Sequence, residues 1–143
     1  MKLALVTTTI NVPRVLELYR RYDPNCEFFV AGDQKTPHVD TLRLCVSLNC
    51  GVQAGTVPGC HYLHPDDQKK WKCSELIGWN CIQRRNIATL EALKAGAEII
   101  ISVDDDNDPM DSGYFKDFEY LFNFPRSGLE VVGRLMPVLH QLT

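Results

Sequence analysis

The chain has 143 residues, of which 45% are hydrophobic and 23% are charged, an ordinary composition for one folded domain. Its formal net charge of −3 is too small to favour nucleic acid or an anionic membrane surface as a partner. No apolar run approaches the roughly 20 residues that span a bilayer, and residues 1–9 lack the pattern of a signal peptide. We therefore expect a soluble, cytoplasmic protein that folds as a single domain over residues 1–143.

Short apolar runs alternate with helical patterns, which is typical of an α/β domain with a mainly parallel sheet. The first expected strand covers Leu3–Thr8, and a helix that begins at Pro13 and ends before Asp23 follows it. The second expected strand covers Glu27–Ala31. Between His38 and Gly59 the apolar residues fit a strand or a short helix equally well.

The second half of the chain continues the alternation. We expect a brief strand at Cys60–Leu63, a helical turn capped by Asp66–Asp67, and the clearest helix at Ile82–Ala95. A central strand at Glu98–Val103, a further helix at Asp111–Phe122 and a last strand at Leu129–Val132 follow. Ile87, Leu90 and Leu93 recur at helical spacing, so their face of the clearest helix, which also carries Asn86, is expected to pack on the sheet.

Three adjacent carboxylates, Asp104, Asp105 and Asp106, follow the most hydrophobic expected strand. Ligands of open α/β sheets bind at the carboxyl ends of strands, and neighbouring carboxylates repel one another unless a cation offsets their charge. If the chain stays extended, Asp104 and Asp106 point the same way and can hold one hard divalent ion, while Asp105 points elsewhere. The alternative is a solvated acidic turn that only ends the strand.

Other common sites do not fit the spacing of the residues. An EF-hand loop that begins at Asp104 would place Pro109 where glycine is needed and Phe115 where glutamate is needed. Neither a P-loop nor a G-x-G-x-x-G fingerprint is present. Four residues could surround a zinc ion: Cys60, His61, His64 and Cys73. Their spacing matches no common closed zinc site. Without a secreted context, we expect the six cysteines to be free thiols rather than a disulfide framework.

Two shorter segments carry further candidate residues. Arg84 and Arg85, at the start of the clearest helix, either pair with a diphosphate or are surface charges. Asn86 either meets a specific polar partner or bonds to neighbouring backbone. In the loop after the second strand, Asp33 could accept hydrogen bonds from a base or ribose, and Lys35 could meet a phosphate.

Taken in order over roughly residues 3–107, these segments resemble the STELLO-type glycosyltransferase-like proteins. The segments that carry the resemblance are Thr7–Pro13, Phe29–Pro37, Tyr62–Leu63, Gln68–Lys70, Arg84–Ile87 and the acidic triplet. The segment Val103–Asp106, where the expected central strand ends, is also similar to the reversibly glycosylated polypeptides, which include nucleotide-sugar mutases. More broadly, Arg-Asn on a helix that leads into a strand and Asp-x-Asp resembles the GT-A glycosyltransferase fold.

The resemblance implies a GT-A-like, three-layer α/β/α fold with a nucleotide-sugar site. It implies that Asp104 and Asp106 hold Mn²⁺ or Mg²⁺ against the diphosphate of the donor, where the metal acts as a Lewis acid. The substrate-binding residues that it implies are Thr7, Thr8, Thr9, Asp33, Lys35, Arg85, Asn86 and Asp105.

The predicted function is a metal-dependent glycosyltransferase that uses a nucleotide-diphosphate sugar and an unknown acceptor. The predicted alternatives are a non-catalytic nucleotide-sugar-binding module and a sugar-nucleotide mutase. Only 37 residues follow Asp106, fewer than the acceptor half of GT-A enzymes, so the catalytic base stays unassigned. A natural short form, a fragment and a homo-oligomer that completes its site by assembly are all consistent with this length.

Overall fold

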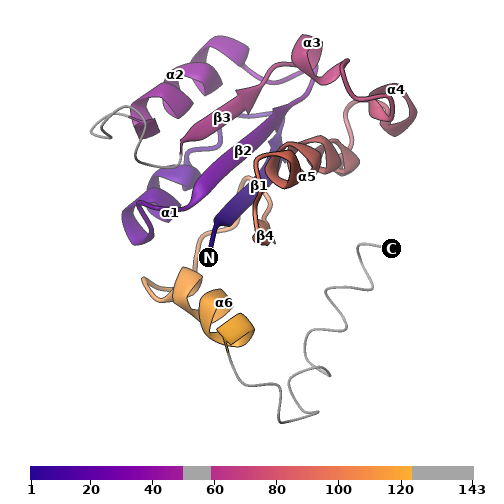
Figure 1. The fold of residues 1–143 in the computed structure, drawn as a ribbon. Coiled ribbons are helices and arrows are strands. Elements are labelled where there is room, and N and C mark those ends of the chain that lie inside the picture. The colour runs from indigo at the N-terminus through magenta and orange to yellow at the C-terminus, as the bar shows by residue number, and fades with distance from the viewer. Residues whose placement is uncertain (50–58, 124–143) are drawn as a thin grey trace.

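The computed structural model describes residues 1–49 and 59–123. One sheet of parallel strands runs through the molecule in the order β3-β2-β1-β4 (Figure 1). The strands are β1 (Leu3–Thr9), β2 (Glu27–Gly32), β3 (Cys60–Leu63) and β4 (Ile99–Ser102). The expected α/β class with a parallel sheet is therefore confirmed.

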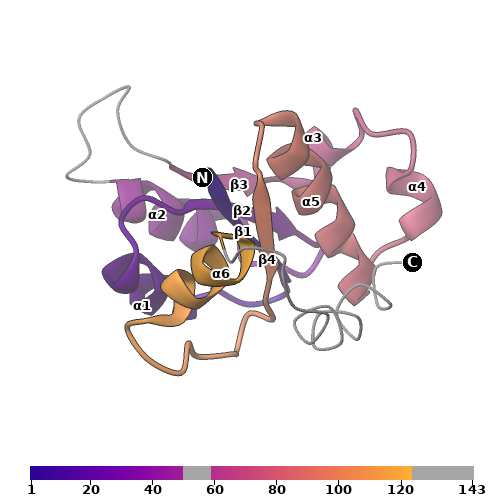
Figure 2. The same ribbon diagram turned by 60° about the horizontal axis from the view of Figure 1, so that its bottom comes forward.

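Helices cover both faces of this sheet. They are α1 (Val15–Tyr22), α2 (His38–Asn49), α3 (Pro65–Gln68), α4 (Ser74–Ile77), the 3-10 turn η1 (Ile82–Arg84), α5 (Arg85–Lys94) and α6 (Tyr114–Asn123). Figures 1 and 2 show α1 and α2 on one face and α5 on the other. Right-handed crossovers explain this, because the chain moves from β1 to β3 in one direction and then returns across the sheet to β4. The arrangement is compatible with a three-layer α/β/α fold.

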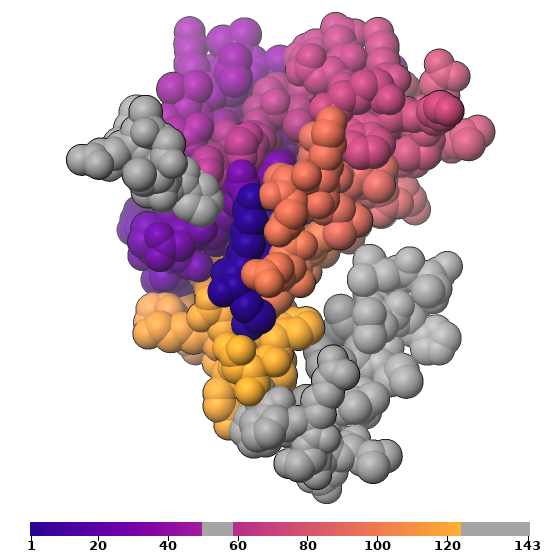
Figure 3. All heavy atoms as spheres, viewed as in Figure 1, coloured from indigo at the N-terminus to yellow at the C-terminus, as the bar shows by residue number. Residues whose placement is uncertain are grey.

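Alternate residues of β1 contribute to two apolar cores. Leu3 and Leu5 belong to the larger core, which also contains residues of α1, α2 and α6. Ala4 and Val6 belong to a smaller core that is formed with α5. In the space-filling view, the indigo N-terminal residues lie between the coral residues of the α5–β4 region and the orange residues of α6 (Figure 3). Both faces of β1 are thereby covered, which fixes the strand that leads into the site described below.

The segment with two open interpretations folds as the helix α2. Leu44 and Leu48, four residues apart, are buried, whereas Leu42 and Val46 are exposed. A strand would have placed all four side chains on one face. Burial at helical spacing therefore decides between the two patterns that the sequence allowed.

The expected sheet-facing side of α5 is partly wrong. Ile87 is buried as predicted, but Asn86 is exposed and Leu93 is 56% exposed. Ala88 and Ala92 instead contact the sheet, where they complete the smaller core. Small side chains let the helix approach the strands closely, so apart from Ile87 the buried face of this helix is marked by alanines rather than by its large apolar residues.

Two further expectations are corrected. Asp66 lies inside α3 rather than capping it, and the N-cap is His64, whose Nδ1 accepts a hydrogen bond from the backbone N–H of Asp66 at 3.2 Å. The strand β4, expected to be central, is an edge strand of the described sheet. The strand expected at residues 129–132 lies outside the described residues. In the described ranges no helix has the length and apolar character needed to cross a membrane.

Tyr62 on β3 packs against the end of β2. Its hydroxyl lies 2.5 Å from Nδ1 of His38, and a side chain larger than hydrogen at Gly32 would overlap its ring. Burial, as the main cause, raises the pKa of Tyr62 from 10.0 to about 12. The folded protein therefore holds the Tyr62 proton more tightly than the unfolded chain does.

This raised pKa predicts a specific dependence of stability on pH. The contribution of Tyr62 is complete below pH 10 and is lost as the pH rises to about 12, because the unfolded chain releases the proton first. Across this window, the free energy of unfolding should fall more steeply with pH in the wild type than in Tyr62→Phe. The difference between the two slopes corresponds to the release of up to about one proton on unfolding. Urea denaturation measures both slopes. The exposed Tyr120→Phe is the control, and equal slopes for Tyr62→Phe and wild type would contradict the prediction.

Candidate functional site

The candidate site lies at the carboxyl ends of β1 and β4. The strand order changes direction at β1, because β2 and β3 follow on one side of it and β4 on the other. Ligands of open α/β sheets bind outside the carboxyl ends of strands at such a switch point. The chain leaves β1 at Thr9 and leaves β4 at Ser102, so the threonines of β1 and the acidic triplet meet there.

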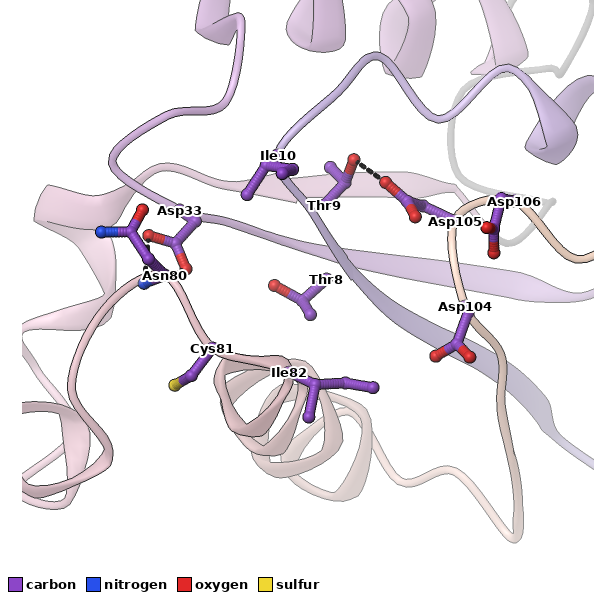
Figure 4. A pocket seen from close by; sticks show the side chains of 10 residues that line it. All are labelled: Thr8, Thr9, Ile10, Asp33, Asn80, Cys81, Ile82, Asp104, Asp105 and Asp106. Carbon is purple, nitrogen blue, oxygen red and sulfur yellow. Dashed lines mark hydrogen bonds between the residues drawn. The ribbon is translucent and has the colours of Figure 1, made fainter.

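A pocket of about 350 Å³, here called the Thr8 pocket, opens between these strand ends. Its lining comes from the end of β1, the loop after β2, the segment that leads into η1, the first residue of η1 and the acidic triplet. It consists of Thr8, Thr9, Ile10, Asp33, Asn80, Cys81, Ile82, Asp104, Asp105 and Asp106. Figure 4 shows the triplet on one side, Asp33 and Asn80 on the other, and Thr8 between them. Four carboxylates thus surround this pocket, and among the described residues no lysine, arginine or histidine lines it.

Asp33 is buried, and its hydrogen bonds fix the part of the Thr8 pocket wall that Asn80 forms. Its carboxylate accepts hydrogen bonds from the backbone N–H of Asn80 at 2.9 and 2.8 Å, and from that of Gln34 at 2.6 Å. Asn80 has a φ of 56°, a left-handed conformation that is uncommon for residues other than glycine. Asp33 therefore holds a strained backbone turn in place at the edge of the pocket.

The acidic triplet forms a turn rather than the extended segment that the alternation argument assumed. The backbone N–H of Asn107 donates to the carbonyl oxygen of Asp104 at 3.3 Å, which closes the turn. The Asp105 carboxylate accepts a hydrogen bond from the Thr9 hydroxyl and is thereby tied to β1 (Figure 4). Asp104 and Asp106 line the Thr8 pocket together in spite of the turn.

A second depression of about 620 Å³, here called the Tyr114 pocket, adjoins the first. It shares Asp104, Asp106 and Ile82 with the Thr8 pocket, and the rest of its lining is Tyr19, Arg85, Ser102, Val103, Asn107, Asp108 and Tyr114. The two depressions therefore meet at the carboxylates of Asp104 and Asp106.

Arg85 is the basic residue that the described chain places beside the triplet. Its Nη1 donates to Oδ1 of Asp104 at 2.7 Å and to the carbonyl oxygen of Val103 at 3.3 Å. The Arg85 side chain is 25% exposed, whereas the Asp104 side chain is 46% exposed. The carboxylate therefore faces solvent more openly than the guanidinium that supports it.

Two tyrosines fix the turn from the other side. The Tyr19 hydroxyl donates to the carbonyl oxygen of Asn107 at 3.0 Å, and the Tyr19 and Tyr114 rings meet edge to face at 5.4 Å. Burial is the main cause that raises the pKa of both hydroxyls, so both keep their protons well into the alkaline range. Tyr19 of α1 thus holds the segment that follows the triplet, and Tyr114 of α6 packs against the Tyr19 ring.

Arg84 is neither a surface charge nor available to a diphosphate. Its side chain is fully buried, and its guanidinium donates to the Ser74 carbonyl and hydroxyl oxygens at 2.7 and 2.9 Å. It also donates to the carbonyl oxygen of Gly78 at 3.2 Å and to the side chain of Gln68. Both sequence-based interpretations of Arg84 are therefore wrong, and its role is to hold the segment that leads to Asn80.

The structure brings most of the predicted site residues together. Those that line one or both pockets are Thr8, Thr9, Asp33, Arg85, Asp104, Asp105 and Asp106. Thr7, Lys35 and Asn86 line neither pocket. Thr7 is buried within the sheet, whereas Lys35 and Asn86 are exposed.

Several lining residues were not predicted from the sequence. Asn80 and Cys81 come from an irregular segment without a motif, Ile82 begins η1, and only the turn-forming Gly78 before them hints at the shape of the segment. Tyr19 and Tyr114 reach the site through tertiary packing of α1 and α6. No local pattern could have assigned these residues to one place.

Within residues 1–49 and 59–123, no three His, Cys, Asp or Glu side chains gather in a group that could hold a metal ion. The five described cysteines are free thiols. Asp104 and Asp106 are the carboxylates that line both pockets, and carboxylate oxygens are hard ligands. Magnesium ions are typically bound through one or two carboxylates together with substrate phosphates and water, so this pair fits such an ion.

No model of a known protein family matches the chain, and no curated protein matches it.

Proposed function

We propose that the protein is a metal-dependent glycosyltransferase of GT-A-like fold that uses a nucleotide-diphosphate sugar as donor. The observation that carries the proposal is the position of Asp104 and Asp106, which line both pockets at the switch point of a parallel sheet. The cytoplasmic location and the assembly into homo-oligomers expected from the sequence stay predictions.

The charge of the site supports a cation as part of the ligand. The Thr8 pocket carries the carboxylates of Asp33, Asp104, Asp105 and Asp106, and a diphosphate would be repelled by them. Mn²⁺ or Mg²⁺ held by Asp104 and Asp106 would neutralise the diphosphate and stabilise the departing nucleoside diphosphate. The pocket therefore suits a metal–diphosphate complex better than it suits a free diphosphate.

The residues around this pair have separate proposed roles. The Thr8 hydroxyl lies in the centre of the pocket, where it donates to the carbonyl oxygen of Ala31 at 2.9 Å. Its oxygen can therefore accept a hydrogen bond from a hydroxyl of the ligand. Asp33 shapes the nucleoside side of the pocket through the backbone of Asn80. Arg85 can donate to a phosphate oxygen from the side of the Tyr114 pocket.

Calorimetry tests the metal requirement directly. We expect uridine or guanosine diphosphate to bind the full chain in the presence of Mn²⁺, and to bind at least about tenfold more weakly after chelation with EDTA, because the carboxylates then repel the diphosphate. Equal affinity with and without Mn²⁺ would rule out the metal–diphosphate bridge.

The products formed from candidate donors separate the enzyme from its alternatives. A glycosyltransferase releases the nucleoside diphosphate by transfer or slow hydrolysis of the donor. A non-catalytic module leaves the donor intact, and a mutase converts it to an isomeric sugar nucleotide. Chromatography of each donor after incubation with purified protein and Mn²⁺ distinguishes the three outcomes.

A further inference from the structure

Asp104 is already engaged by a cation from the protein itself. Oδ1 of Asp104 accepts a hydrogen bond from Nη1 of Arg85 at 2.7 Å. Asp106 differs, since no hydrogen bond or ion pair to it occurs among the described residues. A metal ion at this pair would therefore meet one free carboxylate and one that is shared with an arginine.

We propose that Arg85 is a positioning residue that exchanges partners, holding Asp104 before the metal binds and donating to the diphosphate afterwards. This inference rests on the proposed function, since it assigns a role at the same metal pair. The exchange needs no large movement, because Arg85 and Asp104 line the same Tyr114 pocket and Asp104 also lines the Thr8 pocket.

The position of Arg85 supports the exchange. It belongs to the first turn of α5, and its Nη1 also donates to the carbonyl oxygen of Val103 at 3.3 Å, so the guanidinium is held at the wall of the Tyr114 pocket. A divalent ion at Asp104 would lie close to this guanidinium, and like charges at such a distance repel. A bound diphosphate supplies new acceptors, and the planar arginine fork pairs with phosphate oxygens in a bidentate manner.

The exchange predicts effects of opposite sign in one variant. In Arg85→Gln, Mn²⁺ alone should bind about tenfold more tightly than to wild type, because the competing charge is gone. Uridine diphosphate titrated into the Mn²⁺-saturated variant should bind at least about tenfold more weakly, because its arginine donor is gone. A variant that is only destabilised would bind both more weakly, so the two signs separate positioning from a structural role.

The controls keep charge and side-chain chemistry matched. Arg85→Lys keeps the charge but loses the fork, so its Mn²⁺ affinity should stay within about twofold of wild type while its diphosphate affinity falls. Arg43→Gln removes the same charge from the exposed face of α2, where Arg43 pairs with Asp40, and should change neither affinity.

Isothermal titration calorimetry of the full chain with MnCl₂, and then with uridine diphosphate, measures both affinities. Tighter Mn²⁺ binding with weaker diphosphate binding in Arg85→Gln supports the exchange. Unchanged or weaker Mn²⁺ binding in Arg85→Gln, in a protein whose wild-type Mn²⁺ binding depends on Asp106, overturns the exchange alone. A wild-type protein that binds no Mn²⁺ overturns the proposed function and the exchange with it.

Discussion

Replacing Arg84 by methionine should lower the free energy of unfolding by about 3 kcal/mol or more. The guanidinium of Arg84 is fully buried, and it is the hydrogen-bond donor to Gln68, to both oxygens of Ser74 and to Gly78. Methionine fills a similar volume but leaves these buried acceptors without a donor, and each unsatisfied group costs about 1–3 kcal/mol. Urea denaturation of the variant, followed by fluorescence, measures the change.

The direction of this effect is not obvious, because removing a buried charge can also stabilise a protein. Burial is the main cause that lowers the pKa of Arg84, so the fold does carry a desolvation penalty there. The offset comes from four hydrogen bonds and from the Trp79 ring, whose centroid lies 3.8 Å from the guanidinium carbon. Substitution by an apolar residue removes the penalty but also every one of these contacts.

A matched control separates this role from a general effect of losing an arginine. Arg43→Met removes an exposed arginine whose only described ion pair, with Asp40, joins two exposed side chains, so the change should be below about 1 kcal/mol. If Arg84→Met and Arg43→Met unfold at the same urea concentration, the network around Arg84 does not stabilise the fold.

Local patterns predicted the four described strands in their order along the chain, but they left residues 38–59 open between a strand and the helix that forms there. The runs at Leu3–Thr9 and Glu27–Gly32 are buried almost throughout because both faces of the parallel sheet are covered there, and that signal is visible in the local sequence. The burial of α5 was harder to predict, because its sheet contacts come from alanines that carry little hydrophobic signal.

The candidate site was only partly predictable for a similar reason. Asp104 and Asp106 could be located because they follow a strand, and the carboxyl edge of a parallel sheet is set by topology. The buried position of Arg84 could not be predicted, because the sequence does not distinguish a buried arginine that has several hydrogen-bond acceptors from an exposed one. The wall at Asn80 depends on the left-handed turn that the distant Asp33 holds in place.

The second prediction with a large expected effect concerns Asp106, which together with Asp104 carries the proposed function. In Asp106→Ala, Mn²⁺ binding should weaken at least about 100-fold, and Mn²⁺-dependent binding of uridine diphosphate should be lost with it. The loss of outer partners of a metal site already costs about 10–100-fold in metal affinity, so the loss of a direct carboxylate ligand should cost more. Because Asp106 is exposed and engages no described partner, its removal should leave the urea midpoint unchanged.

Because the urea midpoint of Asp106→Ala is expected to equal that of the wild type, a loss of binding in this variant cannot be attributed to unfolding. Asp117→Ala removes the same charge from an exposed position on α6 that lines neither pocket, so it corrects for the change in net charge. Calorimetry with MnCl₂ and then uridine diphosphate should give wild-type values for Asp117→Ala. Equal affinities of Asp106→Ala and Asp117→Ala would mean that the triplet is a solvated acidic turn, and the metal-dependent transferase would have to be abandoned.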